Sequence, residues 1–145
     1  MAARKLARES RDASAAMGRR FLLLAASVTD LPMLADAVEM AETRELQVHL
    51  ALCFGLAAGL MGNGPILATA AYLHQSVATL VSCCQRLMAL GQTRAQQILW
   101  NLKPDMVRAA QRGAATSMSR IGSFSALTDL ASARHQGQQT RLFMS

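Results

Sequence analysis

Aromatic residues are scarce in this chain of 145 residues: they make up 4% of it, although 52% of the residues are hydrophobic. The apolar content is mostly Ala, Leu, Met and Val, a mixture that favours helix over strand. The alternation of apolar and polar residues that marks strands is missing, and so is any internal repeat. We therefore predict an all-α fold, a compact bundle of about six to seven helices in a single domain over residues 1–145.

Charged residues are absent from Leu46 to Gln85. A membrane hairpin is one interpretation of this run, but Gly62–Pro65 interrupts it and leaves a first arm of about sixteen residues, fewer than the roughly twenty needed to span a bilayer. The second arm is long enough but carries polar side chains, among them His74, which are costly inside a membrane. Two helices buried in a soluble bundle explain the run better, and we predict no membrane insertion.

Cysteines are few, and their spacing does not form a disulfide framework. Cys53, Cys83 and Cys84 all lie in apolar stretches, and the adjacent pair is poorly placed to bond to itself. These features predict a reducing compartment. The pair Arg19–Arg20 resembles a twin-arginine export signal, but the apolar run after it ends at Val28, which disfavours export.

The net charge of +6 and isoelectric point near 10.3 raise the question of nucleic-acid binding. The basic residues do not cluster with aromatic ones, as such binding requires. Arginines are spread along the first thirty residues, and the following segment, with Asp36, Glu39 and Glu42, is acidic. Segments of alternating charge favour docking to oppositely charged protein surfaces, and we predict no nucleic-acid partner.

Prolines, glycines and potential capping residues divide the chain into predicted helices. Asp30 is expected to cap a short acidic helix with Pro32 in its first turn, and Gly62 to make the turn before a helix that begins at Pro65. Thr93 begins a capping-box pattern, and Lys103–Pro104 is expected to end one helix and open another. The expected helices cover residues 2–28, 32–42, 45–61, 65–90, 93–103, 105–112 and 123–135.

No residue pattern in the chain supports an enzyme site. The glycines at 59, 62 and 64 are not followed by the Lys and Ser or Thr of a phosphate-binding loop. Cys83 and Cys84 lie on an uncharged apolar stretch, without the base and the electropositive setting that a nucleophile needs.

One metal hypothesis stays open. His49 and Cys53 are spaced i and i+4, which places both on one helix face, and His74 or Cys84 from the next helix could join them. Imidazole and thiolate ligands suit nickel, copper or zinc, so a helical metal carrier is the alternative function. A buried histidine bonded to a backbone carbonyl or a serine is the simpler explanation of the same residues.

The C-terminus carries apolar residues where solvated tails usually avoid them. Leu142 and Phe143 lie within four residues of the end, beside Arg141, whose guanidinium can bind a carboxylate through two hydrogen bonds. We predict that residues 136–145 form a tail that docks into a partner.

Five segments, in order over nearly the whole chain, resemble the family of the urease accessory protein UreF. They are Glu9–Arg20, His49 with Phe54–Gly55, Leu90–Gln96, Asp129–His135 and Arg141–Ser145. The turn Leu90-Gly91-Gln92-Thr93 together with the Arg-Leu-Phe-x-Ser end is the most specific part of the match.

The resemblance implies a non-enzymatic, all-helical cytoplasmic protein that dimerises and joins the accessory proteins UreD, also called UreH, and UreG. In that family the complex inserts nickel into the urease apoprotein in a GTP-dependent step, and UreF bridges UreG and UreD. No resident cofactor is implied, since the complex handles the nickel. The residues that match the family's partner-binding C-terminal segment are His135, Arg141, Leu142, Phe143 and Ser145.

Two departures from the family pattern accompany the match. A glycine-rich segment that usually precedes the matched region is absent, so we expect an N-terminally shortened chain with apolar faces left uncovered. Gln136 stands where an acidic residue is common, and Gly137 weakens a helix there. The tail is therefore expected to become ordered when it binds.

Overall fold

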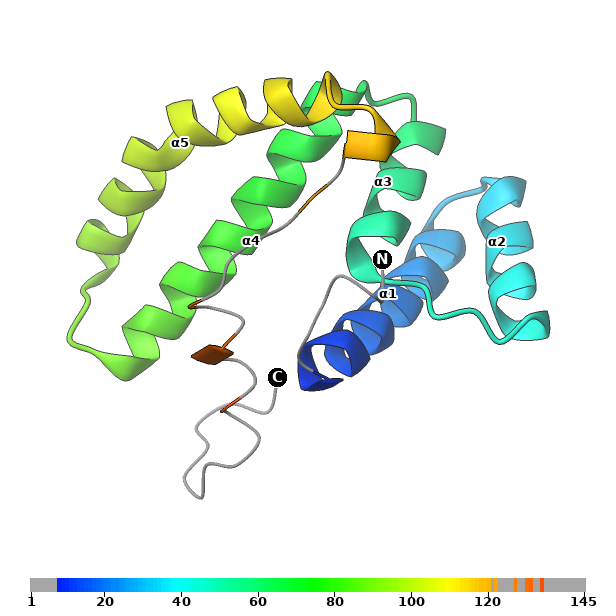
Figure 1. Ribbon diagram of the computed structural model, residues 1–145, viewed down its shortest axis with the longest axis horizontal. Coiled ribbons are helices and arrows are strands. Elements are labelled where there is room, and N and C mark those ends of the chain that lie inside the picture. Colours follow the sequence, from blue (N-terminus) through cyan, green and yellow to red (C-terminus); the bar gives the residue numbers. More distant parts are fainter. Residues whose placement is uncertain (1–7, 121, 123–126, 128–129, 132–133, 135–145) are drawn as a thin grey trace. The chain divides into compact units, whose positions relative to one another are not determined.

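The computed structural model describes residues 8–120, 122, 127, 130, 131 and 134. These residues contain five α-helices and no strand, which confirms the all-α prediction (Figure 1). The helices are α1 (Arg8–Val28), α2 (Pro32–Thr43), α3 (Leu50–Leu60), α4 (Pro65–Leu87) and α5 (Gln92–Ala114), followed by a single 3-10 turn at Met118–Arg120. The chain divides into two compact units, residues 1–60 with 121–145, and residues 61–120. The single domain predicted for residues 1–145 is not tested by this division and stays a prediction.

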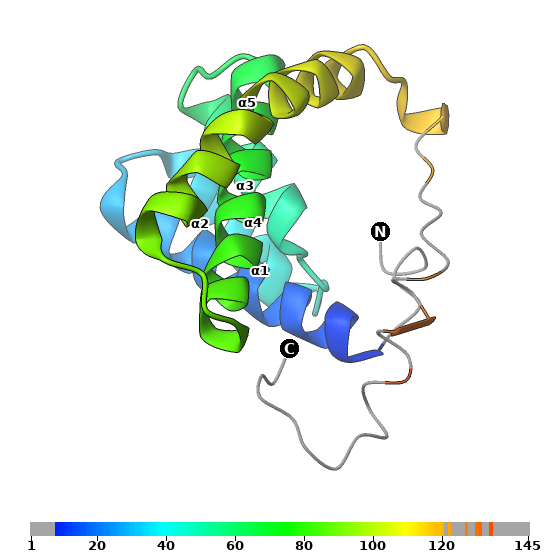
Figure 2. The ribbon, with the colours of Figure 1, turned by 90° about the vertical axis from the view of Figure 1, so that its left-hand side faces the viewer.

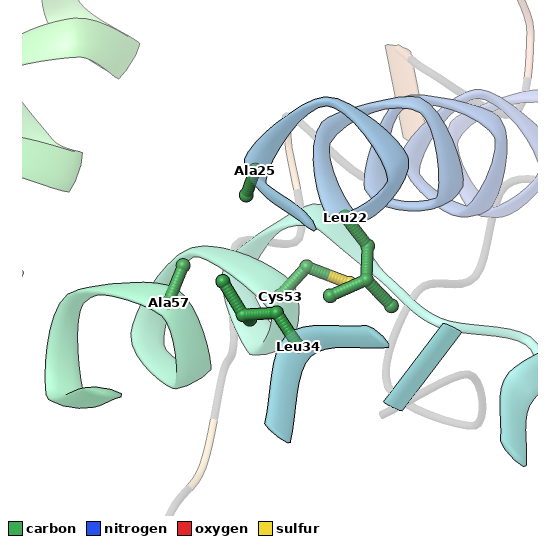
Figure 3. Close-up of a cluster of buried hydrophobic side chains, with 5 residues drawn as sticks. All are labelled: Leu22, Ala25, Leu34, Cys53 and Ala57. Atoms are coloured by element: carbon green, nitrogen blue, oxygen red, sulfur yellow. The ribbon is translucent and has the colours of Figure 1, made fainter. Parts of the chain in front are cut away.

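In the first unit, α1 packs against both α2 and α3. Five buried side chains from the three helices point toward one another and form its core (Figure 3). They are Leu22, Ala25, Leu34, Cys53 and Ala57. The ring of Phe21 stacks on that of Phe54 beside them, with centroids 5.6 Å apart. Small residues at two of the five core positions let the helices approach closely.

The closest approach in this unit is at Gly18 of α1, which lies against the backbone just before α3. A Cβ atom built on Gly18 would be 2.0 Å from the carbonyl oxygen of Val48 and 2.8 Å from the amide nitrogen of Leu50. Real Cβ atoms do not come so close to backbone atoms. Only glycine therefore fits where α1 crosses this segment.

The second unit is an antiparallel pair, α4 and α5, joined by a short turn at residues 88–91. The two helices lie side by side in Figure 1 and again in Figure 2. Val81 of α4 packs with Ala95 and Leu99 of α5, and these three form a small core. Most of the remaining surface of the pair is exposed.

Residues 8–120 contain one α-helix fewer than predicted for them, because α5 runs through Pro104 without a break. The helix predicted over residues 123–135 lies mostly outside the described residues. Proline removes one backbone hydrogen bond and crowds the preceding turn, so it usually ends or kinks a helix. Here the buried face continues on both sides of it, with Leu99 before and Met106 and Ala110 after. Burial along this face outweighs the local cost, and α5 bends instead of ending (Figure 1).

The predicted side-chain caps are wrong, while the turn residues are right. The N-cap positions of α2 and α5 are occupied by Leu31 and Gly91, neither with a side-chain cap, so Asp30 and Thr93 do not fill that role. Pro65 does begin α4, and the turn before it does need glycine, because Gly62 has a φ of +80°.

The third helix begins later than expected, at Leu50 instead of near Glu45. Glu45 itself adopts a left-handed φ of +48°, which stops α2 from continuing into the next segment. The carbonyl of His49 then accepts hydrogen bonds from the amides of Leu52 and Cys53 and starts α3.

In the described part of the chain, α4 alone is both long and apolar enough to cross a membrane. Length and composition are weak evidence for a span, because the core helix of a soluble protein passes the same test. Only 6% of its most apolar window is buried. The expectation of a buried helix is therefore not met for α4.

Candidate functional site

The four residues of the metal hypothesis do not form one cluster. His49 and Cys53 are buried in the first unit, with 3% and 2% of their surfaces exposed. His74 and Cys84 both lie on α4 in the second unit and are exposed. Ten residues of helix separate those two by about 15 Å, so they cannot bind the same ion.

The environment of Cys53 favours the thiol over the thiolate. Burial raises the pKa of the Cys53 thiol above its ordinary value of 9.0, while a backbone hydrogen bond lowers it in part. A metal ligand or nucleophile needs the thiolate, which this position disfavours at neutral pH. Cys53 thus acts as a small apolar core residue.

Among the residues that the structure describes, no three His, Cys, Asp or Glu side chains gather where they could hold a metal ion. His49 is held inside the first unit beside the crossing at Gly18, where its backbone starts α3. These observations give the metal-carrier alternative no support in the described segments.

The predicted partner-binding residues His135, Arg141, Leu142, Phe143 and Ser145 lie outside the described residues. Their role, and the role of residues 136–145 as a docking tail, stay predictions. Two leucines just before them are described and exposed: Leu127 at 84% and Leu130 at 49%.

A surface of unpartnered apolar side chains covers α4. Leu80 is 65% exposed, and Leu67 and Leu87 are also more than half exposed. Isolated exposed leucines are common in proteins, but several on one helix that buries only Val81 are not. Leu80 and Leu87 lie on one side of α4 and Leu67 on another, so the helix exposes apolar area on more than one side.

The outward side of α5 combines an aromatic residue with positive charge. Trp100, the only tryptophan of the chain, is 68% exposed, and the Lys103 ammonium lies 4.1 Å from the centroid of its ring. Val107, two turns further on, is 46% exposed. This face was not among the predicted sites; the pattern that could have revealed it is an apolar pair seven residues apart on the polar side of an amphipathic helix.

The positive charge of the chain is concentrated in the second unit. Residues 61–120 carry six basic side chains and one acidic one, a net charge of +5, whereas residues 1–60 carry seven of each. All six basic side chains lie on exposed residues. The acidic residue, Asp105, pairs with Arg108.

In the first unit, an exposed ion pair joins Arg19 of α1 to Glu42 of α2, with 2.9 Å between the charged atoms. A shallow pocket opens beside this pair, lined by apolar side chains that include Leu22, Val38 and Leu46. Its lining contains no cluster of groups suited to catalysis. The pocket is a gap in the packing between α1 and α2.

The described segments thus define a class of protein: an all-helical chain that presents apolar and basic helix faces. Its relatives give that class a name. The UreF family profile matches residues 1–103, and the chain belongs to the UreF family of urease accessory proteins.

Three relatives, each named urease accessory protein UreF, align with almost the whole chain. The protein of Bradyrhizobium sp. strain BTAi1 is 38% identical over 138 residues, which are 95% of this chain and 56% of the relative. That of Corynebacterium glutamicum strain R is 32% identical over 139 residues, covering 96% and 62% of the two chains. That of Arthrobacter sp. strain FB24 is 30% identical over all 145 residues and 64% of the relative. The chain therefore spans between 56% and 64% of the length of each of these relatives.

Proposed function

We propose that this chain is a non-enzymatic scaffold in a UreD/UreF/UreG complex that inserts nickel into the urease active site in a GTP-dependent step. Membership of the UreF family carries the proposal, since the relatives are named for a helper role in urease maturation. The exposed apolar side chains of α4 support it, because a scaffold needs surfaces that its companions cover.

The proposal extends to partners and location. UreD, UreG and the urease apoprotein are the proposed partners, with a homodimer of this chain inside the complex. Nickel is cargo of the complex, and we propose no resident cofactor, no nucleic-acid partner and no membrane insertion. The cytoplasm is the proposed location, in keeping with three free cysteines in the described residues.

Copurification tests this function directly. The tagged chain is produced together with UreD, UreG and urease apoprotein of the same source, and we expect UreD and UreG to be recovered with it. Urease activity in nickel-supplemented extract should depend on the chain. Recovery of neither accessory protein, together with unchanged urease activity in its absence, would refute the proposal.

The tail has its own test, deletion of residues 141–145. We expect this deletion to lower recovery of at least one accessory protein, because it removes Arg141 and the apolar pair Leu142 and Phe143. A matched control replaces Gln138 and Gln139 with alanine, which keeps the tail's charge and apolar residues. Equal recovery of both proteins after the deletion would contradict the docking role.

A further inference from the structure

The outward face of α5 offers an anchor for another protein. Trp100 and Val107 are seven residues apart and so lie within about 20° of each other around the helix, roughly 10 Å apart along it. Both are exposed, Trp100 at 68%. Exposed tryptophans flanked by other apolar groups are the side chains that most often dominate binding energy in protein interfaces.

The charges nearest to this anchor are positive. Lys103 lies about 50° round the helix from the Trp100–Val107 line on one side, and Arg108 lies about 90° round on the other. Asp105, the one acidic residue of α5, pairs with Arg108, so no acidic residue of α5 remains for Lys103. An apolar strip with a basic residue beside it fits an apolar strip with acidic residues beside it.

We propose that this face of α5 binds an acidic amphipathic helix of a partner protein in the urease-maturation complex, with Trp100 as the central contact. The inference rests on the proposed function for the identity of the partner, and on the charges and exposures of α5 for its chemistry. The partner helix presents apolar residues one heptad apart, flanked by Asp or Glu. This mode is the helix-on-helix recognition in which apolar anchors give affinity and charges give register.

A protein partner suits the face better than nucleic acid does. Trp100 already has a cation over its ring, which hinders a base from stacking there. Arg108 is engaged by a carboxylate, and no second aromatic side chain accompanies Trp100 on α5. The anchor next to Trp100 is the aliphatic Val107, which fits an apolar side chain.

Copurification of variants tests the surface within the complex. Trp100→Ala and Lys103→Glu should each lower recovery of UreD, UreG or urease apoprotein at least tenfold. Arg20→Glu on α1 and Met33→Ala on α2 are the controls, since they change charge or exposed apolar area outside α4 and α5; both should keep recovery unchanged. Circular dichroism checks that every variant is folded. Equal recovery in all variants would overturn the inference while leaving the proposed function intact.

A direct probe separates failure of the inference from failure of the function. A synthetic tryptophan-free helical peptide of about 18 residues carries leucines seven apart flanked by glutamates, and its twin carries lysines instead. Because Trp100 is the chain's only tryptophan, its emission reports binding at this face. We expect the glutamate peptide to shift the emission to the blue and the lysine peptide to leave it unchanged. Equal responses to both peptides, or to neither, would overturn the inference even if the accessory proteins copurify.

Discussion

At the scale of single residues, the crossing at Gly18 is the most restrictive position of the described chain. Three backbone atoms of residues 48–50 lie within 3 Å of where a Cβ would be, and backbone cannot move aside as a flexible side chain can. Gly18 lies in one of the segments that resemble the UreF family, but the sequence alone gives no reason for a glycine there. The reason lies in a contact between residues about thirty positions apart, which a helical pattern does not reveal.

We predict that Gly18→Ala lowers the free energy of unfolding by about 1–3 kcal/mol or more, because α1 must shift away from α3. Urea denaturation followed by circular dichroism measures it. Gly59→Ala in α3 is the matched control: nothing lies within 4 Å of its Cβ, so helix propensity should stabilise that variant by up to about 1 kcal/mol. Equal stability of the two variants would contradict the close crossing.

The buried thiol of Cys53 gives a second prediction at this scale. Its pKa is raised in the folded chain by burial, so folding favours the protonated thiol. This contribution is intact below pH 9, the ordinary pKa, and is lost as pH rises through the higher folded pKa. The free energy of unfolding should therefore fall above pH 9, and less steeply in Cys53→Ala.

Alkylation by iodoacetamide at pH 8 provides the companion measurement. Cys84, which is exposed, should react quickly, whereas Cys53 should react only after unfolding. Mass spectrometry of the labelled peptides distinguishes them. Fast labelling of Cys53 in the folded chain would show that the core around Leu22 and Leu34 is open.

At the scale of helices, α2 is held by burial and not by charge. Leu34 is fully buried between α1 and α3, whereas both side chains of the Arg19–Glu42 pair are exposed. Exposed ion pairs contribute roughly 0–1 kcal/mol, and deletion of a buried leucine costs roughly 2–5 kcal/mol.

We therefore predict that Leu34→Ala destabilises the chain several times more than Glu42→Ala does. Thermal denaturation at low and high salt measures both. The loss in Glu42→Ala should shrink as salt rises, and the loss in Leu34→Ala should not. A larger effect of Glu42→Ala at any salt would contradict this assignment.

Proline inside α5 supplies another prediction for this scale. Pro104 is exposed and denies the carbonyl of Trp100 its usual hydrogen bond, so Pro104→Ala should stabilise the chain, on the order of 1–3 kcal/mol. Pro65→Ala is the control, since a proline at the start of a helix costs nothing. Thermal melts compare the two. A destabilised Pro104→Ala would mean that the bend of α5 is needed by its packing on α4.

At the scale of the whole molecule, the sequence predicted the features that depend on composition and on the residues that begin or end helices. The all-α class, the start of α4 at Pro65 and the glycine turn at Gly62 followed from residue types alone. What it could not predict depends on tertiary packing: α5 passes through Pro104 because Met106 and Ala110, beyond the proline, are buried. The same limit applies to the metal hypothesis. The sequence does not reveal that His49 is buried while His74 is exposed, so it could not show that these residues do not form one site.

The exposed leucines of α4 have a consequence for how long this protein persists in a cell. Chains with uncovered apolar helices are substrates for chaperones and proteases, so their lifetime depends on how soon companions arrive. Its abundance should then follow the supply of those companions more closely than its own rate of synthesis. A surplus produced alone would be degraded or would collect in insoluble deposits.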